Sequence, residues 1–305
     1  MRPTVDLSII VASYNTRELL RGCLQSIYDT TQGITFELIV TDDCSSDDTS
    51  KMVMECFPQA KLIRNPVNMR YAKSNNNALK AARGRYGLLL DSDTVVQPGA
   101  FATLVRFMDE HGDAAVAGPR LVNRDGSVQH CIRSFPGMWP MIFQSLGLHK
   151  LFPGNRFTDQ YYNTRFDYSR AQPVDSIGTT AFIIRRSTWE TYGMLDERFT
   201  LAFVDLAYCL MLKLNKQQVY YVPDATVMHY GNLTVNANGL KEIRLLHQAL
   251  RVFYDCYYAP RHSFLMRAIV HLGIPLRQQV KLLEFRFSKN KQVFGGIAIS
   301  SSNRD

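Results

Sequence analysis

The chain has 305 residues, of which 46% are hydrophobic and 20% are charged. This length and composition exclude a disordered tail and a fibrous repeat, and they suit one large α/β domain or two small ones. The six cysteines stand far apart, with no pair at zinc-ligand spacing. We expect them to be reduced thiols of a cytoplasmic protein.

The formal net charge of +8 is concentrated near the C-terminus. Residues 240–305 hold eleven basic and four acidic side chains, whereas the other 239 residues hold 24 and 23. A partner that needs positive charge is therefore expected to meet the C-terminal segment. No run of about eighteen apolar residues occurs, and the apolar run at residues 7–12 is too short for a signal-peptide core.

The first 118 residues alternate short apolar runs with amphipathic segments. Strands are predicted at 7–12, 37–41, 61–64 and 86–90, and helices at about 19–27, 48–56, 71–82 and 98–111. This alternation predicts a mostly parallel sheet with helices on both faces. Polar clusters begin at Ser13, Asp42 and Asp91, directly after strands, and so fall at the sheet edge where such proteins bind ligands.

The pattern changes after residue 118. Asp125-Gly126 predicts a hairpin turn, and residues 135–173, rich in aromatic residues, Pro and Gly, predict an irregular insertion over the active face. Strands are then predicted at 176–185 and 218–222, and helices at 187–192, 205–214 and from 240 to about 287.

Asp91-Ser92-Asp93 follows a buried strand and is the first candidate for chemistry. Two carboxylates one residue apart suit Mg²⁺ or Mn²⁺, which leave open positions for phosphate oxygens. An Asp-rich turn that satisfies loop amides is the alternative. Similarly, Asp42 could bind a base or ribose, or only close an Asx turn.

Other candidates also have structural alternatives. Arg70 and Lys73 lie near a predicted helix start, where phosphates could meet both cations and free amides, or they are solvated surface charges. Asp205 opens a helix beside Phe203, where burial would raise its pKa and make it a better general base, or it is an N-cap. His229 follows a strand as a metal or phosphate ligand, or is structural.

Six segments occur in the order and spacing of glycosyltransferase family two, and the chain most resembles its rhamnosyltransferase-like branch. They are 7–15, 37–49, 68–79, 88–94, 178–199 and 222–231. The resemblance covers about residues 5–235 and implies a GT-A fold, an α/β architecture with two halves on one mixed sheet. A Rossmann-like nucleotide-binding half (1–118) would precede an acceptor half (119–239), followed by a basic, amphipathic helical segment (240–305).

Carried over residue by residue, the resemblance places several side chains around a nucleotide-sugar donor. Ala12, Tyr14 and Asp42 match positions around the base and ribose, and Arg70 and Lys73 fall near the diphosphate. The donor would be dTDP-rhamnose or a UDP-sugar, and the acceptor a hydroxyl of a cell-surface glycan or lipid-linked precursor.

The same resemblance implies the catalytic residues. Asp91 and Asp93 match a metal–diphosphate motif, with Asp93 as the direct ligand, and His229 matches a histidine close to the Mn²⁺ or Mg²⁺ ion. Asp205 matches the base that deprotonates the acceptor, which attacks in one displacement and inverts the anomeric carbon. The Gln-x-x-Arg-Trp signature of processive members is absent, which favours transfer of a single sugar.

Three positions depart from the family pattern. Val204 and Ala207 stand where carboxylates are usual, and Arg70 replaces a common Gly. The departures open an alternative, a weak or inactive sugar-nucleotide-binding subunit of a glycan assembly complex. A nucleotidyltransferase would share the architecture, but residues 13–16 lack its Gly-rich loop.

Residues 241–287 interleave basic residues with apolar ones and with Tyr254, Tyr257 and Tyr258. This composition suits helices on an anionic bilayer, which would place the protein peripherally on the inner face of the cell membrane, near a lipid-linked acceptor. A helical pair packed on the catalytic domain, or a dimer interface, is the alternative. Nucleic acid is not expected as a partner because no recognition motif accompanies the basic residues, and the oligomeric state is left open.

Overall fold

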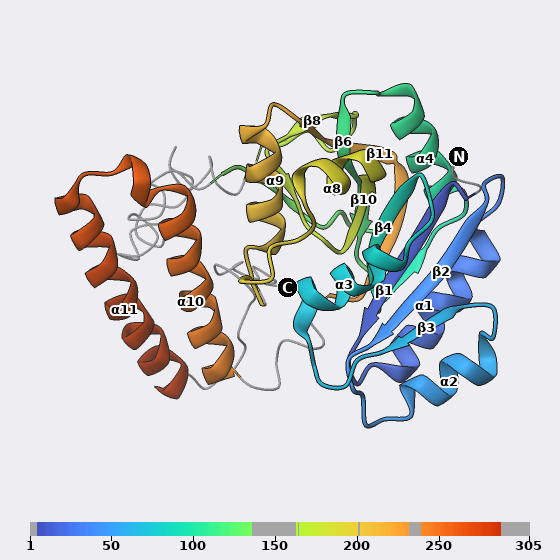
Figure 1. Cartoon of the computed structure of the whole chain (residues 1–305), viewed down its shortest axis with the longest axis horizontal. Helices are drawn as coiled ribbons and strands as arrows, with labels where there is room; N and C mark the ends of the chain where they lie inside the picture. The colour runs from blue at the N-terminus through green and yellow to red at the C-terminus, as the bar shows by residue number, and fades with distance from the viewer. Residues whose placement is uncertain (1–4, 136–162, 164, 201, 232–238, 288–305) are drawn as a thin grey trace.

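The computed structural model describes residues 5–135, 163, 165–200, 202–231 and 239–287, and a mixed β-sheet runs through its centre (Figure 1). Among these residues the sheet has nine strands, in the order β3-β2-β1-β4-β10-β6-β11-β5, with β8 beside β11. The strands are β1 (Leu7–Ser13), β2 (Phe36–Asp42), β3 (Lys61–Arg64), β4 (Tyr86–Asp91), β5 (Thr94–Val96), β6 (Ala114–Val122), β8 (Gln172–Val174), β10 (Ala181–Arg185) and β11 (Gln218–His229). A separate two-stranded ribbon pairs β7 (Ile132–Arg133) with β9 (Ser176–Ile177).

Helices cover both faces of this sheet (Figure 1). One face carries α1 (Arg17–Thr30), α2 (Thr49–Cys56) and α4 (Ala100–Glu110). The other carries α3 (Arg70–Ala81), α8 (Arg186–Tyr192) and α9 (Val204–Leu214). Beyond α9 lies a helical hairpin made of α10 (Gly239–Tyr257), a short 3₁₀ turn η2 (Ala259–Arg261) and α11 (Phe264–Phe287).

The β4 strand is a continuous apolar run because both of its faces are buried. Leu88 and Leu90 pack in the core under α1 and α4, whereas Leu89 between them packs in the core under α3 and α8. A strand that is buried on both faces needs apolar residues at every position, so the alternation of hydrophobic and polar residues disappears. The first polar residue, Asp91, therefore marks the point where the strand leaves the core.

The polar clusters after the first strands meet at one edge, as predicted. β1 pairs in parallel with β2 on one side and β4 on the other, which places Ser13 beside Asp42 and Ala12 beside Asp91. The strand order reverses direction at β1, and a topological switch point of this kind opens a crevice for ligands at the carboxyl ends of the strands.

Three strand predictions were wrong or incomplete. β6 was not predicted, because its sequence begins Ala-Ala-Val-Ala-Gly and alanine favours helices. The strand predicted at 176–185 is divided into β9 and β10, since the Thr180 carbonyl turns to accept the Asp91 N–H group. β11 continues past residue 222 to His229.

Part of the predicted irregular insertion also forms a strand, because Gln172–Val174 pairs with β11 as β8. Most of the segment 135–173 lies outside the described residues. β6 crosses the predicted boundary at residues 118 and 119, so the two predicted halves share a strand, and the division into halves stays a prediction.

A predicted hairpin turn and the predicted C-terminal helices are present in the structure. A hairpin turn forms at Asp125-Gly126, where Gly126 has φ +83° and Val122 bridges Val128. The C-terminal segment is helical over α10 and α11, and all six cysteines are free. Within the described part of the chain, we find no helix with the length and apolar character needed to cross a membrane.

Candidate functional site

Asp91, Asp93 and His229 come together at the carboxyl edge of the sheet. One ligand atom from each lies within 4.8 Å of the other two, and His229 Nε2 is 3.4 Å from Asp93 Oδ1. Asp91 ends β4, Asp93 lies in the turn before β5, and His229 ends β11. Because β5 pairs with β11 and places Thr94 opposite His229, two distant parts of the sequence meet in this cluster.

The cluster concentrates negative charge in a buried position. Burial, followed by the charge of Asp93, raises the pKa of Asp91 to about 6. Burial works to lower the pKa of His229, but its hydrogen bond to Asp93 and the nearby carboxylate charges outweigh this and raise it. A divalent cation would relieve the repulsion between the two carboxylates, and oxygen donors with one imidazole suit Mn²⁺ and, less closely, Mg²⁺. The donor set therefore fits a metal ion.

Gln129 holds the imidazole of His229 from behind. Its Oε1 lies 2.9 Å from His229 Nδ1, while its Nε2 donates to the His229 main-chain carbonyl at 2.8 Å and to Asn123 Oδ1 at 2.7 Å. A main-chain carbonyl only accepts, so the amide NH₂ must face it and Oε1 must face the ring. Nδ1 then donates its proton to Gln129, and in the neutral ring Nε2 presents a lone pair toward the carboxylates.

The turn that carries Asp93 is fixed by a buried chain of hydroxyl groups. Ser13 Oγ lies 2.8 Å from Thr16 Oγ1, which lies 2.9 Å from Ser92 Oγ. The middle residue of Asp-Ser-Asp is thereby tied to the end of β1 and the start of α1. Preorganisation of this kind limits the rearrangement that a bound ion would require.

Asp205 lies in the first turn of α9, after Phe203 with φ +67°. Burial raises the pKa of Asp205, although the Leu206 N–H group, which donates to Oδ1 at 2.9 Å, and the charge of Arg133 oppose the rise. The Asp205 charge also contributes to the raised pKa values of Asp91 and Tyr71. Asp205 is therefore close enough to the cluster to act on it electrostatically.

The residues predicted to bind the base and ribose differ in their burial and in their contacts. Ala12 is half-buried beside Asp91, and Tyr14 is exposed. Asp42 is buried, and its two carboxylate oxygens accept from the Ser45 N–H group and from the Ser50 hydroxyl. The carboxylate of Asp42 thus holds the loop after β2.

Arg70 and Lys73 lie on the first turn of α3. Arg70 has φ +68°, in the left-handed region that favours glycine, which accounts for a Gly at this position being common in the resembled family. Lys73 Nζ lies 4.0 Å from Glu197 Oε2. In the described structure its ion-pair partner is thus Glu197, and neither carboxylate of the metal cluster.

Sequence reasoning missed Asp43, Tyr71 and Gln129. Asp43 is buried and accepts from Asn65 Nδ2 at 2.6 Å and Ser74 Oγ at 2.8 Å, which ties the end of β2 to α3. Its place in the polar cluster after β2 was the available signal. Tyr71 donates from its hydroxyl to the Thr179 carbonyl at 2.9 Å. Tyr71 lies in the family-like segment 68–79, but nothing in that segment indicates its contact with Thr179, and Gln129 lies in none of the six segments.

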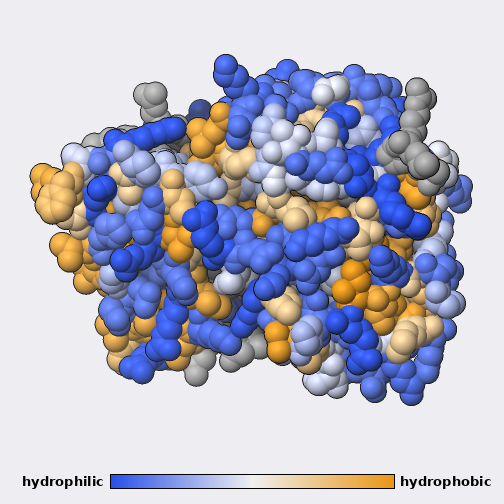
Figure 2. All heavy atoms as spheres, viewed as in Figure 1, coloured by the Kyte–Doolittle hydropathy of each residue, from blue (hydrophilic) through white to orange (hydrophobic). Residues whose placement is uncertain are grey.

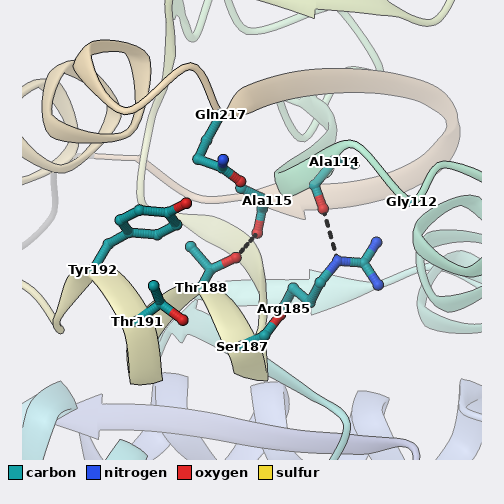
Figure 3. A pocket seen from close by; sticks show the side chains of 9 residues that line it. All are labelled: Gly112, Ala114, Ala115, Arg185, Ser187, Thr188, Thr191, Tyr192 and Gln217. Atoms are coloured by element: carbon teal, nitrogen blue, oxygen red, sulfur yellow. Dashed lines mark hydrogen bonds between the residues drawn. The ribbon is translucent and has the colours of Figure 1, made fainter.

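A hollow lies around Arg185 and Thr188, at the end of the sheet opposite to Asp91 (Figure 3). Arg185 pairs with Tyr86 at the amino end of β4, away from Asp91. Its guanidinium donates to the carbonyls of Ala114, Met108 and His111 at 2.7 to 3.0 Å. These contacts hold the end of α4 against the sheet, so this arginine has a structural role.

The architecture is that of a GT-A glycosyltransferase. A GalNAc-T7 structure with UDP, GalNAc and Mn²⁺ matches with a TM-score of 0.61 and 14% identity, over 85% of this chain and 49% of that chain. A mannosyltransferase from Pyrobaculum calidifontis, in complex with GDP-Man and Mn²⁺, matches with a TM-score of 0.58 and 16% identity, over 94% of this chain and 77% of that chain.

The chain belongs to glycosyl transferase family 2, whose family model matches residues 8–170. A curated relative, the N-acetylglucosaminyl-diphospho-decaprenol L-rhamnosyltransferase of Mycobacterium tuberculosis, is 22% identical over 86% of this chain and 87% of its own length. The predicted family, fold class and enzyme class are thereby confirmed, and the protein is a glycosyltransferase.

Proposed function

We propose that this enzyme is an inverting, metal-dependent transferase that moves one sugar from a nucleotide sugar to a hydroxyl of a lipid-linked or cell-surface glycan precursor. The observation that carries the proposal is the meeting of Asp91, Asp93 and His229 at the carboxyl edge of the sheet, with Asp205 beside them. The named acceptor of the Mycobacterium tuberculosis relative, a diphospho-decaprenol, supports a lipid-linked substrate.

Asp93, Asp91 and His229 would hold Mn²⁺ or Mg²⁺, with Asp93 as the direct ligand. The imidazole favours Mn²⁺ over Mg²⁺. When bound, the ion supplies positive charge opposite the diphosphate that leaves with the nucleotide. Arg70 and Lys73, at the start of α3, would add positive charge next to the diphosphate. To bind a phosphate oxygen, Lys73 would have to release its ion-pair partner Glu197.

Asp205 is the proposed general base. It accepts the proton of the acceptor hydroxyl as that oxygen attacks the anomeric carbon on the face opposite the leaving diphosphate, and one displacement inverts the configuration. Burial raises the pKa of this carboxyl, which strengthens the base. The Leu206 N–H group and the charge of Arg133 oppose this rise in the pKa of Asp205.

The donor base and ribose would lie against Ala12 and Tyr14 at the end of β1, and the donor would be dTDP-rhamnose or a UDP-sugar. Because the two oxygens of Asp42 are engaged by Ser45 of the loop after β2 and by Ser50 of α2, we assign Asp42 the role of shaping this part of the site. Its contact with the nucleotide would then pass through the loop at residues 43–46.

The packing of the C-terminal hairpin explains two of the positions that depart from the family pattern, Val204 and Ala207. Val204 and Ala207 are buried, and the Tyr257 hydroxyl of α10 donates to the Ala207 carbonyl at 3.3 Å. A carboxylate at either position would lie under α10 at a high cost in desolvation. The apolar residues are therefore explained by the packing of the hairpin, and an inactive subunit is not needed to explain them.

Binding of nucleotide sugars to Asp93→Ala tests the donor site. We expect one member of a panel of dTDP-, UDP- and GDP-sugars to raise the melting temperature of the wild type by about 5 °C at saturation, and only with Mn²⁺. The shift should vanish in Asp93→Ala and persist in Asp113→Ala, a control at an exposed carboxylate. NMR of the product should show the inverted anomer.

Other outcomes would overturn parts of the proposal. A shift that needs no metal, or that survives in Asp93→Ala, would remove the metal site. Retention of the anomeric configuration would remove Asp205 as base in a single displacement. A nucleotide that binds without any transfer would favour the non-catalytic subunit.

A further inference from the structure

The outermost helix of the molecule exposes a continuous apolar stripe. Eight large hydrophobic side chains of α11 are between 46% and 85% exposed, although most large apolar side chains of the described residues are buried. Seven of them form what we call the α11 stripe: Leu265, Ile269, Leu272, Leu276, Val280, Leu283 and Phe287. Single exposed hydrophobic residues are ordinary, but a contiguous set marks an interaction surface.

The stripe keeps to one side of the helix. The stripe has an eleven-residue repeat, which relates Leu265 to Leu276 and Leu276 to Phe287. At about 100° per residue its members fall within a sector of about 80°, and no charged residue of α11 lies inside it. An eleven-residue repeat stays nearly in line on a straight helix, whereas the seven-residue repeat of a coiled coil requires a left-handed supercoil. The stripe therefore suits a flat surface.

The opposite side of α11 attaches the helix to the rest of the protein. Ile274, about 160° from the centre of the stripe, is buried in the core that α9 and α10 share. Arg277, at the flank of the helix, contacts His247 of α10 at 3.3 Å. The stripe faces away from these contacts, and Figure 2 shows hydrophobic residues along the margin where Figure 1 places α11. The catalytic sheet leaves it uncovered.

The charge around the stripe identifies the surface that it fits. Residues 240–287 hold eight basic and three acidic side chains, a net charge of +5. Arg286 flanks the stripe on one side, about 40° from Leu272, and Glu284 and Arg277 flank it on the other, about 40° and 60° from Val280. Lys281 Nζ pairs with Glu284 at 2.6 Å, so the net charge around the stripe stays positive. Apolar residues that insert beside a net positive charge are typical of a helix lying in the interface of an anionic bilayer.

We infer that α11 docks the enzyme on an anionic membrane surface, with the α11 stripe inserted into the interfacial layer. The inference deepens the proposed function and rests on its lipid-linked acceptor, which would be presented at the same surface. The hairpin also contacts the catalytic half, since the Phe253 ring of α10 lies 5.2 Å from that of Phe203, which precedes Asp205. Docking would thus hold the proposed base near the membrane.

Vesicle sedimentation of the full chain, without donor or acceptor, tests the inference independently of catalysis. We expect the wild type to bind phosphatidylcholine vesicles that contain phosphatidylglycerol more tightly than pure phosphatidylcholine vesicles. Leu272→Glu with Leu276→Glu should weaken binding about 100-fold. Arg286→Gln, at the edge of the stripe, should weaken it about 5-fold. Leu214→Glu is the matched control, because Leu214 is 50% exposed on α9, and it should bind as the wild type does.

Two results would overturn the inference. One is the absence of vesicle binding, or equal binding by the Leu272/Leu276 variant. The other is a wild-type dimer in light scattering that this variant dissociates, which would assign the stripe to a second copy of the chain. Metal-dependent nucleotide binding by the same variant should be unchanged, so a failure of the membrane inference remains distinct from a failure of the proposed function.

Discussion

The two ends of the central sheet carry the same kinds of charged residues in opposite electrostatic states. At the amino end, Arg85 lies between Asp6 and Asp109, with N–O distances of 2.5 to 3.1 Å. Hydrogen bonds, from the Thr35 main chain and Arg85 to Asp6 and from Arg85 to Asp109, lower the pKa values of both carboxyls. At the carboxyl end, burial raises the pKa values of Asp91 and Asp205.

This contrast in pKa separates charged residues that stabilise the fold from charged residues whose repulsion a ligand would relieve. Paired carboxylates at the amino end contribute free energy of folding on their own. Buried carboxylates that repel each other oppose folding, and such strain concentrates at functional sites because a substrate or metal ion relieves it. Substitutions at the two ends should therefore separate activity from stability.

The largest effect is expected for Asp93→Ala. Loss of the direct metal ligand should lower kcat/KM for sugar transfer about 1000-fold, since stabilisation of the leaving diphosphate depends on the ion. Without metal, the free energy of unfolding should change little, because the substitution removes the repulsion between Asp93 and Asp91 together with the contact between Asp93 and His229. Transfer assays and urea unfolding in a chelating buffer measure the two quantities. A destabilised variant would contradict the contrast between the two ends.

Asp205→Asn should lower kcat by a factor of about 10² and leave donor binding intact, because the amide cannot accept the acceptor proton. In the wild type, the base is active only when deprotonated. Because the pKa of Asp205 is raised above 3.8, the rate should decline at a higher pH than for an ordinary aspartate as the solution is acidified. A pH–rate profile for both enzymes checks this, and a decline that persists unchanged in Asp205→Asn would assign it to another group.

Gln129→Ala should have an intermediate effect on the metal. Without the acceptor for Nδ1–H, the His229 ring loses its fixed tautomer and orientation, and Mn²⁺ affinity should fall about 10- to 100-fold. Titration of Mn²⁺ followed by electron paramagnetic resonance gives the affinity directly. Gln172→Ala removes a half-buried glutamine that donates to the Asp167 carbonyl and serves as control. Equal affinities in the two variants would show that Gln129 does not position His229.

The sequence predicts the carboxyl end of the sheet better than the rest. Apolar runs locate β1, β2 and β4, and because parallel strands end at the same edge, the polar residues after them must lie together. The structure brings Asp91, Asp93 and His229 together, as the prediction that they bind one metal ion requires. Their roles remain predictions for the experiments above.

The supporting residues were not predictable in this way. Gln129 and His229 are 100 positions apart, and no local pattern indicates that a hairpin after β6 reaches the end of β11. The same holds for α11, where the mixture of basic and apolar residues indicated an amphipathic helix. Which side of that helix is uncovered depends on its packing against α10, through Ile274.

The smallest effect is expected at the amino end, for Arg85→Ala. The side chains of Arg85 and Asp109 are 36% and 42% exposed, so solvent screening should limit the loss in the free energy of unfolding to about 1 kcal/mol. The lowered pKa values mean that Asp6 and Asp109 contribute stability above the ordinary carboxyl pKa of 3.8, and that this contribution is lost as the pH falls through their folded values. Urea unfolding at neutral and acidic pH should therefore show a smaller difference between variant and wild type in acid. Transfer activity should be unchanged, and a loss of activity without a loss of stability would reverse the assignment of the two ends.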